Sequence, residues 1–245
     1  MRYFGRIGKT LKHSFSAKYF AEKFERESLS HECCYELFEL PEIECVKELM
    51  QMSGLVGFNV TIPYKQQIIP YLDGLSGEAE AIGAVNCVKR ELDGRFIGYN
   101  TDVEGVRVSL DKLLDGVKVE RALVLGSGGA AQAVRYVLAE RGIAYSIVSR
   151  TKGSGDLTYD DLSAEVMRDN QLIINCSPVG MYPHVDDAPI IPYAMLSTSH
   201  YLFDLVYNPI QTRFMKLGVE RGVSTLSGID MLYAQAEAAW EIWSK

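Results

Sequence analysis

The chain has 245 residues, of which 47% are hydrophobic and 23% charged, an ordinary composition for a globular protein. This length can bury a core without disulfides or metals, in one large domain or two small ones. The net charge of -7 argues against a general nucleic-acid binder, which carries a basic face. No apolar run approaches the roughly 20 residues of a membrane span. We therefore expect neither a nucleic-acid partner nor a membrane partner.

The five cysteines are odd in number and form no CxxC pair, which argues against a disulfide framework or a zinc knuckle. We predict that most of them are small buried residues in a reducing compartment. The four histidines form no close ligand pair, and no metal site is predicted. The first six residues are interrupted by charges and contain no apolar signal core. These features favour a cytoplasmic protein.

Short strand-like runs alternate with helical patterns along the chain, which is typical of an α/β fold. In the first half we predict strands at Tyr3–Ile7, Cys34–Leu40 and up to Pro63, with helices at Ala17–Glu27, Glu42–Met52 and from Tyr64. Asp93-Gly94 predicts the turn of a hairpin, because glycine readily adopts the positive φ of a tight turn.

The second half continues the alternation. We predict helices at Val103–Leu114, Ala130–Arg141 and Ile229–Ser244, and strands at Arg121–Leu125, Tyr145–Ser149, Leu172–Asn175 and Leu202–Leu205. We place one domain at residues 1–102 and a second at 103–228. The final helix, within 229–245, is expected to pack back on the first domain.

A glycine-rich turn follows the strand that ends at Leu125. The stretch Gly126-Ser127-Gly128-Gly129-Ala130-Ala131 fits GxGxx(G/A), in which glycines permit the tight turn and the close approach of a pyrophosphate. The following helix offers its N-terminal N–H groups to the phosphates. Gly126, Gly128, Gly129 and Ala130 are therefore candidate cofactor residues, with a plain structural turn as the alternative.

The end of the next strand indicates which dinucleotide binds. An enzyme that uses NAD normally carries Asp or Glu there for the ribose hydroxyls, whereas this chain has Ser149-Arg150-Thr151-Lys152. Arginine makes strong charge-assisted bonds to phosphate oxygens, so Arg150 and Thr151 favour the 2′-phosphate of NADP. A solvated basic loop is the alternative.

Small polar residues gather at the ends of apolar strands in the first half. Hydroxyls and amides suit a polyhydroxy ligand, because each can match a substrate hydroxyl as donor or acceptor. Taken singly, each has a structural alternative: Ser16 and Asp102 could cap helices, Asn86 could occupy a turn, and Lys65 could be a surface lysine. The candidates are Ser14, Ser16, Asn59, Thr61, Lys65, Asn86 and Asp102.

The combination of motifs resembles the shikimate dehydrogenase family along essentially the whole chain. The most specific stretches are Asn59-Val-Thr-Ile-Pro-Tyr-Lys65 and Asn100-Thr-Asp102. The others are His13-Ser-Phe-Ser16, Gly83-Ala-Val-Asn86, Gly126–Ala130, Ser149-Arg-Thr151, Asn175-Cys-Ser-Pro-Val-Gly-Met181, Asp204-Leu-Val-Tyr207-Asn-Pro209 and Gly228-Ile-Asp-Met-Leu-Tyr-Ala-Gln235.

The resemblance implies two α/β domains, one binding substrate and one Rossmann-like domain binding NADP, with the active site in the cleft between them. It implies reduction of 3-dehydroshikimate to shikimate with NADPH, in aromatic amino acid biosynthesis. The implied substrate residues are Ser14, Ser16 and Tyr207 for the carboxylate, and Thr61, Asn86, Asp102 and Gln235 for the ring hydroxyls. Met181 and Gly228 are expected near the nicotinamide.

Ketone reduction needs a hydride and a proton, and Lys65 kept protonated by Asp102 could supply the proton. We expect these two residues to be catalytic. Three departures from the family pattern are Ala17 for Pro, Ser149 for Asn, and a glycine- and acid-rich segment after Arg150. Two alternatives stay open: a quinate/shikimate dehydrogenase that uses NAD, and a non-catalytic NADP-binding regulatory protein. The sequence does not determine the oligomeric state, and a homodimer is kept open.

Overall fold

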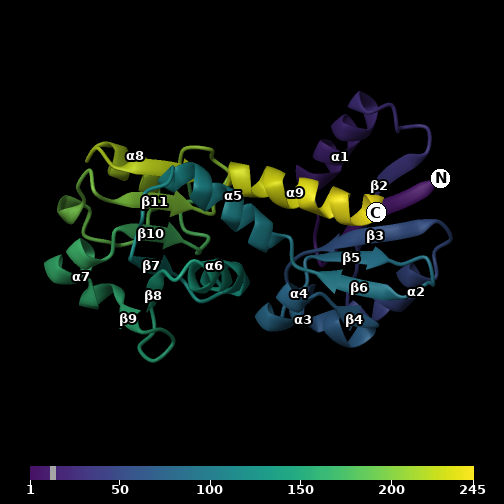
Figure 1. Cartoon of the computed structure of the whole chain (residues 1–245), viewed down its shortest axis with the longest axis horizontal. Helices are drawn as coiled ribbons and strands as arrows, with labels where there is room; N and C mark the ends of the chain where they lie inside the picture. The colour runs from purple at the N-terminus through teal and green to yellow at the C-terminus, as the bar shows by residue number, and fades with distance from the viewer. Residues whose placement is uncertain (12–14) are drawn as a thin grey trace. The chain divides into compact units, whose positions relative to one another are not determined.

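The computed structural model describes residues 1–11 and 15–245. The chain divides into two compact units, one made of residues 1–101 and 236–245, the other of residues 102–235. Each unit has its own six-stranded sheet with helices packed against it (Figure 1). Both units are α/β, which confirms the fold class predicted from the alternating patterns.

The sheet of the first unit has the strand order β2-β1-β3-β5-β6-β4. Strand β1 pairs in parallel with β2 and β3, whereas β5 runs antiparallel to β3 and β6. The β5–β6 pair is the expected hairpin, and Gly94 in its turn has a φ of 89°. The strands are β1 (Arg2–Gly8), β2 (Cys33–Glu39), β3 (Leu55–Val60), β4 (Gly74–Leu75), β5 (Cys87–Arg90) and β6 (Phe96–Tyr99).

Helices enclose this sheet through two separate cores. The core around Ile7, Phe58 and Ile68 is shared with α2 (Val46–Met50), α3 (Tyr64–Gln67) and α4 (Gly77–Ile82). The other core is aromatic and brings α1 (Phe15–Arg26) and the end of α9 (Ile229–Ser244) onto β1. In that core the Trp243 indole donates a hydrogen bond to the carbonyl of Val88 at 2.9 Å. The last turns of the chain are therefore part of the first unit's interior.

The second unit contains a fully parallel sheet of order β12-β11-β10-β7-β8-β9. The chain starts in the middle at β7, moves outward through β8 and β9, and then returns to the other side of β7 at β10. This is the strand order of dinucleotide-binding folds, with its reversal between β7 and β10. The strands are β7 (Arg121–Leu125), β8 (Ala144–Ser149), β9 (Leu157–Thr158), β10 (Leu172–Asn175), β11 (Tyr201–Asp204) and β12 (Ser224–Ser227).

Four helices and the start of α9 complete the second unit. Met167 of α7 (Ala164–Asp169) and Phe214 of α8 (Arg213–Val219) share one core with Leu123 and Ile173 of the sheet. Helices α5 (Asp102–Leu114) and α6 (Gly129–Glu140) pack against each other and against the strands. Single 3₁₀ turns occur at Ile43–Cys45, Ile69–Tyr71, Tyr159–Asp161 and Tyr193–Met195.

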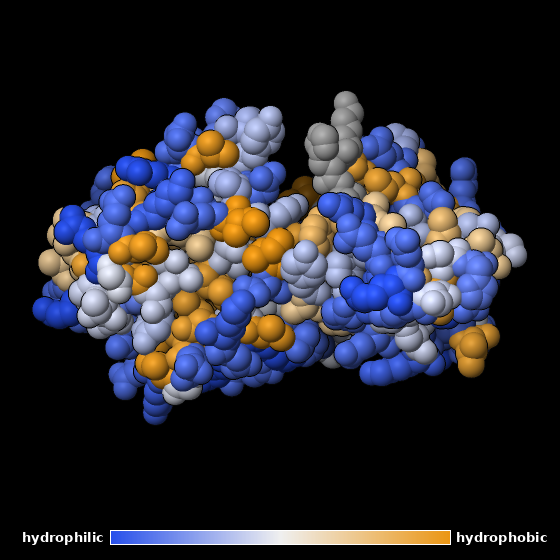
Figure 2. All heavy atoms as spheres, turned by 90° about the horizontal axis from the view of Figure 1, so that it is seen from above, coloured by the Kyte–Doolittle hydropathy of each residue, from blue (hydrophilic) through white to orange (hydrophobic). Residues whose placement is uncertain are grey.

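The surface contains both kinds of side chain in mixture. Figure 2 shows a largely hydrophilic face on which hydrophobic residues form small groups. The exposed large hydrophobic residues come from many elements, among them Ile62, Leu92 and Ile190. Within the described part of the chain, no helix has the length and apolar character of a bilayer span.

Candidate active site

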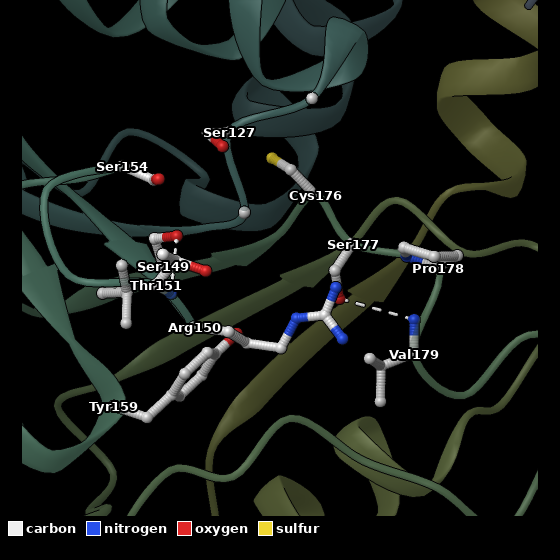
Figure 3. Close-up of a pocket in the computed structure, with 13 residues that line it drawn as sticks. Ser127, Ser149, Arg150, Thr151, Ser154, Tyr159, Cys176, Ser177, Pro178 and Val179 are labelled. Carbon is white, nitrogen blue, oxygen red and sulfur yellow. Dashed lines mark hydrogen bonds between the residues drawn. The ribbon is translucent and has the colours of Figure 1, made fainter.

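A cavity of about 360 Å³ opens at the carboxyl ends of β7, β8 and β10 (Figure 3). Its walls are the segments that follow these strands, namely Gly126–Gly128, Ser149–Thr151 and Cys176–Val179. Strands β7 and β10 are the neighbours at which the strand order reverses. Open parallel sheets bind ligands at such a switch point, so the topology itself predicts a site here.

The glycines of the turn after β7 are required for two different reasons. Gly126 has a φ of 105°, which a residue with a side chain rarely adopts. At Gly128 and Gly129, by contrast, a Cβ would meet no protein atom within 4 Å. The packing of the chain does not require these two glycines, whereas close approach of a phosphate to the N-terminus of α6 would. The turn therefore fits a dinucleotide pyrophosphate.

The β8 side of the cavity is cationic and hydroxyl-rich. Arg150 and Thr151 are exposed, and none of the described lining residues is a carboxylate. Figure 3 shows the Arg150 side chain extended toward the Ser177–Val179 segment, away from the hydroxyls of Ser149 and Thr151. Burial raises the pKa of the Tyr159 phenol, and the charge of Arg150 opposes this shift. The cationic Arg150, in a cavity whose described lining has no carboxylate, suits the 2′-phosphate of NADP.

Sequence reasoning missed several lining residues. Ser127 lies inside the glycine motif and Ser177 is the second residue after β10, so both could have been found from their positions at strand ends. Ser154 and Tyr159 come from the glycine- and acid-rich segment, whose sequence contains no periodic pattern. Cys176 also lines the cavity, and burial raises its pKa, so it is a neutral thiol there.

A buried polar network fixes the loops after β10 and β11. The fully buried Asp204 carboxylate accepts hydrogen bonds from the Asn175 amide at 2.9 Å, the Thr212 hydroxyl at 2.5 Å and the Val206 N–H at 3.0 Å. The Ser177 hydroxyl donates to the Asn175 oxygen at 2.6 Å. Burial raises the pKa of Asp204 to about 6 despite these donors. The network links a cavity wall to the interior of the sheet.

The first unit contains a polar cluster beyond the carboxyl ends of β1 and β3. The Arg6 guanidinium donates to the Thr61 hydroxyl at 2.9 Å and to the Ser16 hydroxyl at 3.3 Å. Ser16 lies in the first turn of α1, and Thr61 directly follows β3. Because β1 and β3 are parallel neighbours, their ends meet at one edge and bring these side chains together. The structure thus joins two predicted substrate residues through an arginine that the sequence analysis did not select.

Asn86 and Asn59 brace the same edge. The buried Asn86 oxygen accepts from the backbone N–H of Thr101 at 2.7 Å and from the Thr101 hydroxyl at 3.2 Å. Asn59 accepts from the Tyr35 hydroxyl at 2.8 Å and donates to the Asn86 carbonyl at 3.2 Å. Asn59 therefore connects β2 to the backbone at Asn86 and stabilises the loop there. Lys65 lies on α3, where its carbonyl accepts from Val85.

The remaining predicted residues are placed as follows. Ser14 lies outside the described residues, and Asp102 is the buried first residue of α5. Met181 and Tyr207 are exposed and do not line the described cavity, and neither does Gln235, which lies on α9. Gly228 is buried, and a side chain there would collide with the Leu205 carbonyl, so packing alone requires its glycine. Among the residues that the structure describes, no His, Cys, Asp and Glu cluster could hold a metal.

The comparisons with known proteins match this architecture. A sequence profile described as "Shikimate dehydrogenase substrate binding domain" matches residues 7–88. A protein of Clostridium beijerinckii named "Shikimate dehydrogenase (NADP(+))" is 39% identical, with all of this chain and 93% of the relative aligned. The chain belongs to the shikimate dehydrogenase family. This confirms the resemblance read from the nine motifs.

Solved structures of the family superpose on the whole chain. The shikimate 5-dehydrogenase of Thermus thermophilus, in complex with NADP(H) and shikimate, is 31% identical with a TM-score of 0.85. All of this chain and 94% of that chain are covered. The shikimate 5-dehydrogenase of Listeria monocytogenes, in complex with shikimate and NAD, is 29% identical with a TM-score of 0.88, covering 99% and 91% of the two chains. Members of the family therefore share the fold of both units.

Proposed function

We propose that this chain reduces 3-dehydroshikimate to shikimate with NADPH, and catalyses the reverse oxidation. The observation that carries the proposal is the cavity at the switch point of the parallel sheet. It combines a glycine turn open to a ligand with the cationic loop at Arg150. Relatives named NADP-dependent shikimate dehydrogenases, aligned over the whole chain, support this reading.

The cofactor-binding residues are proposed from this cavity and from the first turn of α6, which contains Gly129 and Ala130 and follows the cavity-lining Gly128. Gly126, Gly128, Gly129 and Ala130 hold the pyrophosphate, and Arg150 with Thr151 holds the 2′-phosphate. Arg150 is exposed, so its side chain can turn toward Thr151. That side of the cavity carries the hydroxyls of Ser149, Thr151 and Ser154, which can donate to the same phosphate. Met181 and Gly228 are proposed near the nicotinamide. When bound, NADPH supplies the hydride.

The substrate residues are proposed from the first unit and from the family motifs. Ser16 and Thr61 present hydroxyls at one strand edge, and the amide of Asn86 is fixed by the N–H and hydroxyl of Thr101. The proposed set is Ser14, Ser16, Thr61, Asn86, Tyr207 and Gln235. Such groups match a polyhydroxy acid because each can donate or accept.

Lys65 and Asp102 are the proposed catalytic residues. An ammonium at the reacting oxygen would stabilise the developing negative charge and then donate its proton. In the direction of oxidation, the neutral amine would accept that proton. Asp102 begins a helix in the interior, where a carboxylate is rare unless it has a function or a partner.

The NADP-dependent activity is favoured over the two alternatives. The wall of the cavity lacks, among its described residues, the carboxylate that an NAD enzyme uses for the ribose. A regulatory protein would not need a lysine and an acid in the family's catalytic motifs. We also propose a cytoplasmic location and a role in aromatic amino acid biosynthesis. The five free cysteines fit a reducing compartment.

The test is an initial-rate assay of the purified chain with shikimate or quinate, each with NADP or NAD, followed by the absorbance of the reduced nicotinamide. We expect the highest kcat/KM for shikimate with NADP. Equal kcat/KM for NADP and NAD would overturn the cofactor assignment, and a preference for quinate with NAD would establish the alternative enzyme. Tight NADP binding by calorimetry without turnover of either acid would identify the regulatory protein.

A further inference from the structure

Arg6 is a cation on the substrate side of the first unit. It is the fifth residue of β1, where the strand is otherwise built from small, apolar and aromatic residues after Arg2. Its side chain is half-buried and donates to two hydroxyls that the family motifs assign to the substrate, Ser16 and Thr61. The guanidinium therefore lies at the candidate substrate site.

The charge of Arg6 has no counter-ion among the described residues. Its hydrogen bonds go to neutral hydroxyls, and no described carboxylate lies within ion-pair distance. Two other half-buried arginines pair with carboxylates, Arg107 with Glu140 at 2.6 Å and Arg141 with Asp111 at 2.8 Å. Arg2 and Arg90 have no described carboxylate partner either, but each lies over an aromatic ring, that of Phe4 or Phe96. Buried charges are normally paired, so Arg6 lacks an anion that the chain does not itself provide.

The hydrogen-bond directions leave room for that anion. A guanidinium has five N–H donors and no acceptor, so Ser16 and Thr61 must accept from Arg6. Two donors are used, and the others remain for a ligand. Because the hydroxyl oxygen of Thr61 accepts, its hydrogen is free to point toward a negatively charged group. Ser16 can donate in the same way, or to the Tyr35 phenol, whose pKa is raised by burial.

We propose that Arg6 binds the carboxylate of the substrate and selects the acid form over neutral analogues. The inference rests on the proposed function, because shikimate and 3-dehydroshikimate carry one carboxylate as their only charge. Arginine and carboxylate form a planar, two-bonded pair of favourable geometry. The hydroxyl of Ser16 then completes the anion's hydrogen bonds, and the hydrogen of Thr61 stays available for a ring hydroxyl of the same ligand. Arg6 is thus a specificity-determining residue of this chain.

The test compares shikimate with its neutral methyl ester in the wild type and in Arg6→Gln, Arg6→Lys and Arg2→Gln. Arg2 is the matched control: it is half-buried on the same strand and donates to the Trp243 carbonyl at 3.5 Å. Arg2 lies four residues earlier, or roughly 13 Å along the strand, beyond the Debye length at physiological salt. The tryptophan fluorescence of Trp240 and Trp243 reports the folding of the first unit in each variant.

For Arg6→Gln we expect the KM for shikimate to rise roughly 10- to 150-fold, the scale of one hydrogen bond between charged groups. The KM for the ester should change less than about threefold, because the ester has no charge to lose. Arg6→Lys should fall between wild type and Arg6→Gln, since the ammonium keeps the charge without the planar fork. Arg2→Gln should leave both KM values and kcat near those of the wild type.

An equal rise for acid and ester in Arg6→Gln would show a structural role and overturn the proposal, and so would an unchanged KM for the acid. If Arg6→Gln does not fold, Arg6→Lys decides the matter by the KM for the ester divided by the KM for the acid. This ratio falls below the wild-type ratio if Arg6 recognises the carboxylate, and it stays constant if it does not. Absence of wild-type activity on shikimate would instead refute the proposed function, which the wild-type assay reveals before any variant is compared.

Discussion

The buried carboxylate of Asp204 should make the stability of the second unit depend on pH in an unusual direction. Burial raises its pKa from 3.8 to about 6, although three hydrogen-bond donors oppose the shift. Its other titratable neighbours, Cys176 and Tyr193, have pKa values raised above their usual range and stay neutral below pH 8. Asp204 is therefore the group of this network that titrates between pH 4 and 7.

The size of the effect follows from the pKa. One pKa unit corresponds to about 1.4 kcal/mol, so ionising Asp204 in the folded state costs about 3 kcal/mol relative to the unfolded chain. Because the folded state binds this proton more tightly, the stabilisation is fully present below pH 4. It is then lost as the pH rises through 6. Asp204→Asn cannot titrate, so the difference in unfolding free energy, wild type minus variant, should fall by about 3 kcal/mol between pH 4 and 7.

The assay is urea unfolding of both proteins at several pH values, followed by far-ultraviolet circular dichroism. Both tryptophans belong to the first unit, so their fluorescence separates its unfolding from that of the second unit. Asp161→Asn is the control of opposite sign, because hydrogen bonds from Thr158 lower the pKa of that exposed carboxylate. The reasoning would be refuted if the unfolding free energy of the wild type, minus that of Asp204→Asn, stayed constant or rose with pH.

Four further predictions concern the site and the core. Lys65→Ala should lower kcat by roughly 10²- to 10⁴-fold with a smaller change in KM, and near-normal kcat would remove Lys65 as the proton donor. Ser14→Ala with Ser16→Ala should raise KM for shikimate strongly, at about 1.5–3 kcal/mol for each hydroxyl, and normal binding by calorimetry would leave only a capping role. Arg150→Ala should raise KM for NADP, increasingly so at low salt, while KM for NAD stays nearly constant; an unchanged NADP preference would exclude Arg150 from the site. Trp243→Ala should destabilise the first unit by about 3–5 kcal/mol in urea unfolding, because a side chain that is only 2% exposed leaves a cavity; a loss under 1 kcal/mol would contradict the packing.

Much of the fold was predictable because its signals are local. The run Ala122–Leu125 with the following glycines predicts β7 and the start of α6 to within one residue. The segments that were missed are short or weakly patterned. Three of the four residues of strand β12, Ser224–Ser227, are polar. Strands β4 and β9 have two residues each, and α4, α7 and α8 have fewer than eight. Strand order depends on pairings far apart in sequence, so only the resemblance indicated it.

The candidate site shows the same limit. The glycines and Arg150 could be found from their positions after strands, because a tight turn and a phosphate-binding loop are each formed by a few consecutive residues. Arg6 could not, since its importance depends on Thr61, 55 residues later, and on the absence of a described carboxylate nearby. Tyr159 likewise enters the cavity from a segment without a pattern. Sequence reasoning selected Gly126, Gly128, Arg150 and Thr151, which line the cavity, whereas the pairing of distant residues required the structure.

The aromatic core of the first unit imposes an order on folding during synthesis. Its interior is completed by residues 236–245, which are made after the whole of the second unit, the continuous stretch 102–235. On the ribosome, the stretch 1–101 emerges first but lacks Trp243, so its aromatic face on Phe4 and Phe20 stays open to solvent while the second unit is made. Domains usually fold from the N-terminus onward as they are synthesised. Here the later segment can reach its native state first, and the earliest segment is the one exposed longest to chaperones and to aggregation.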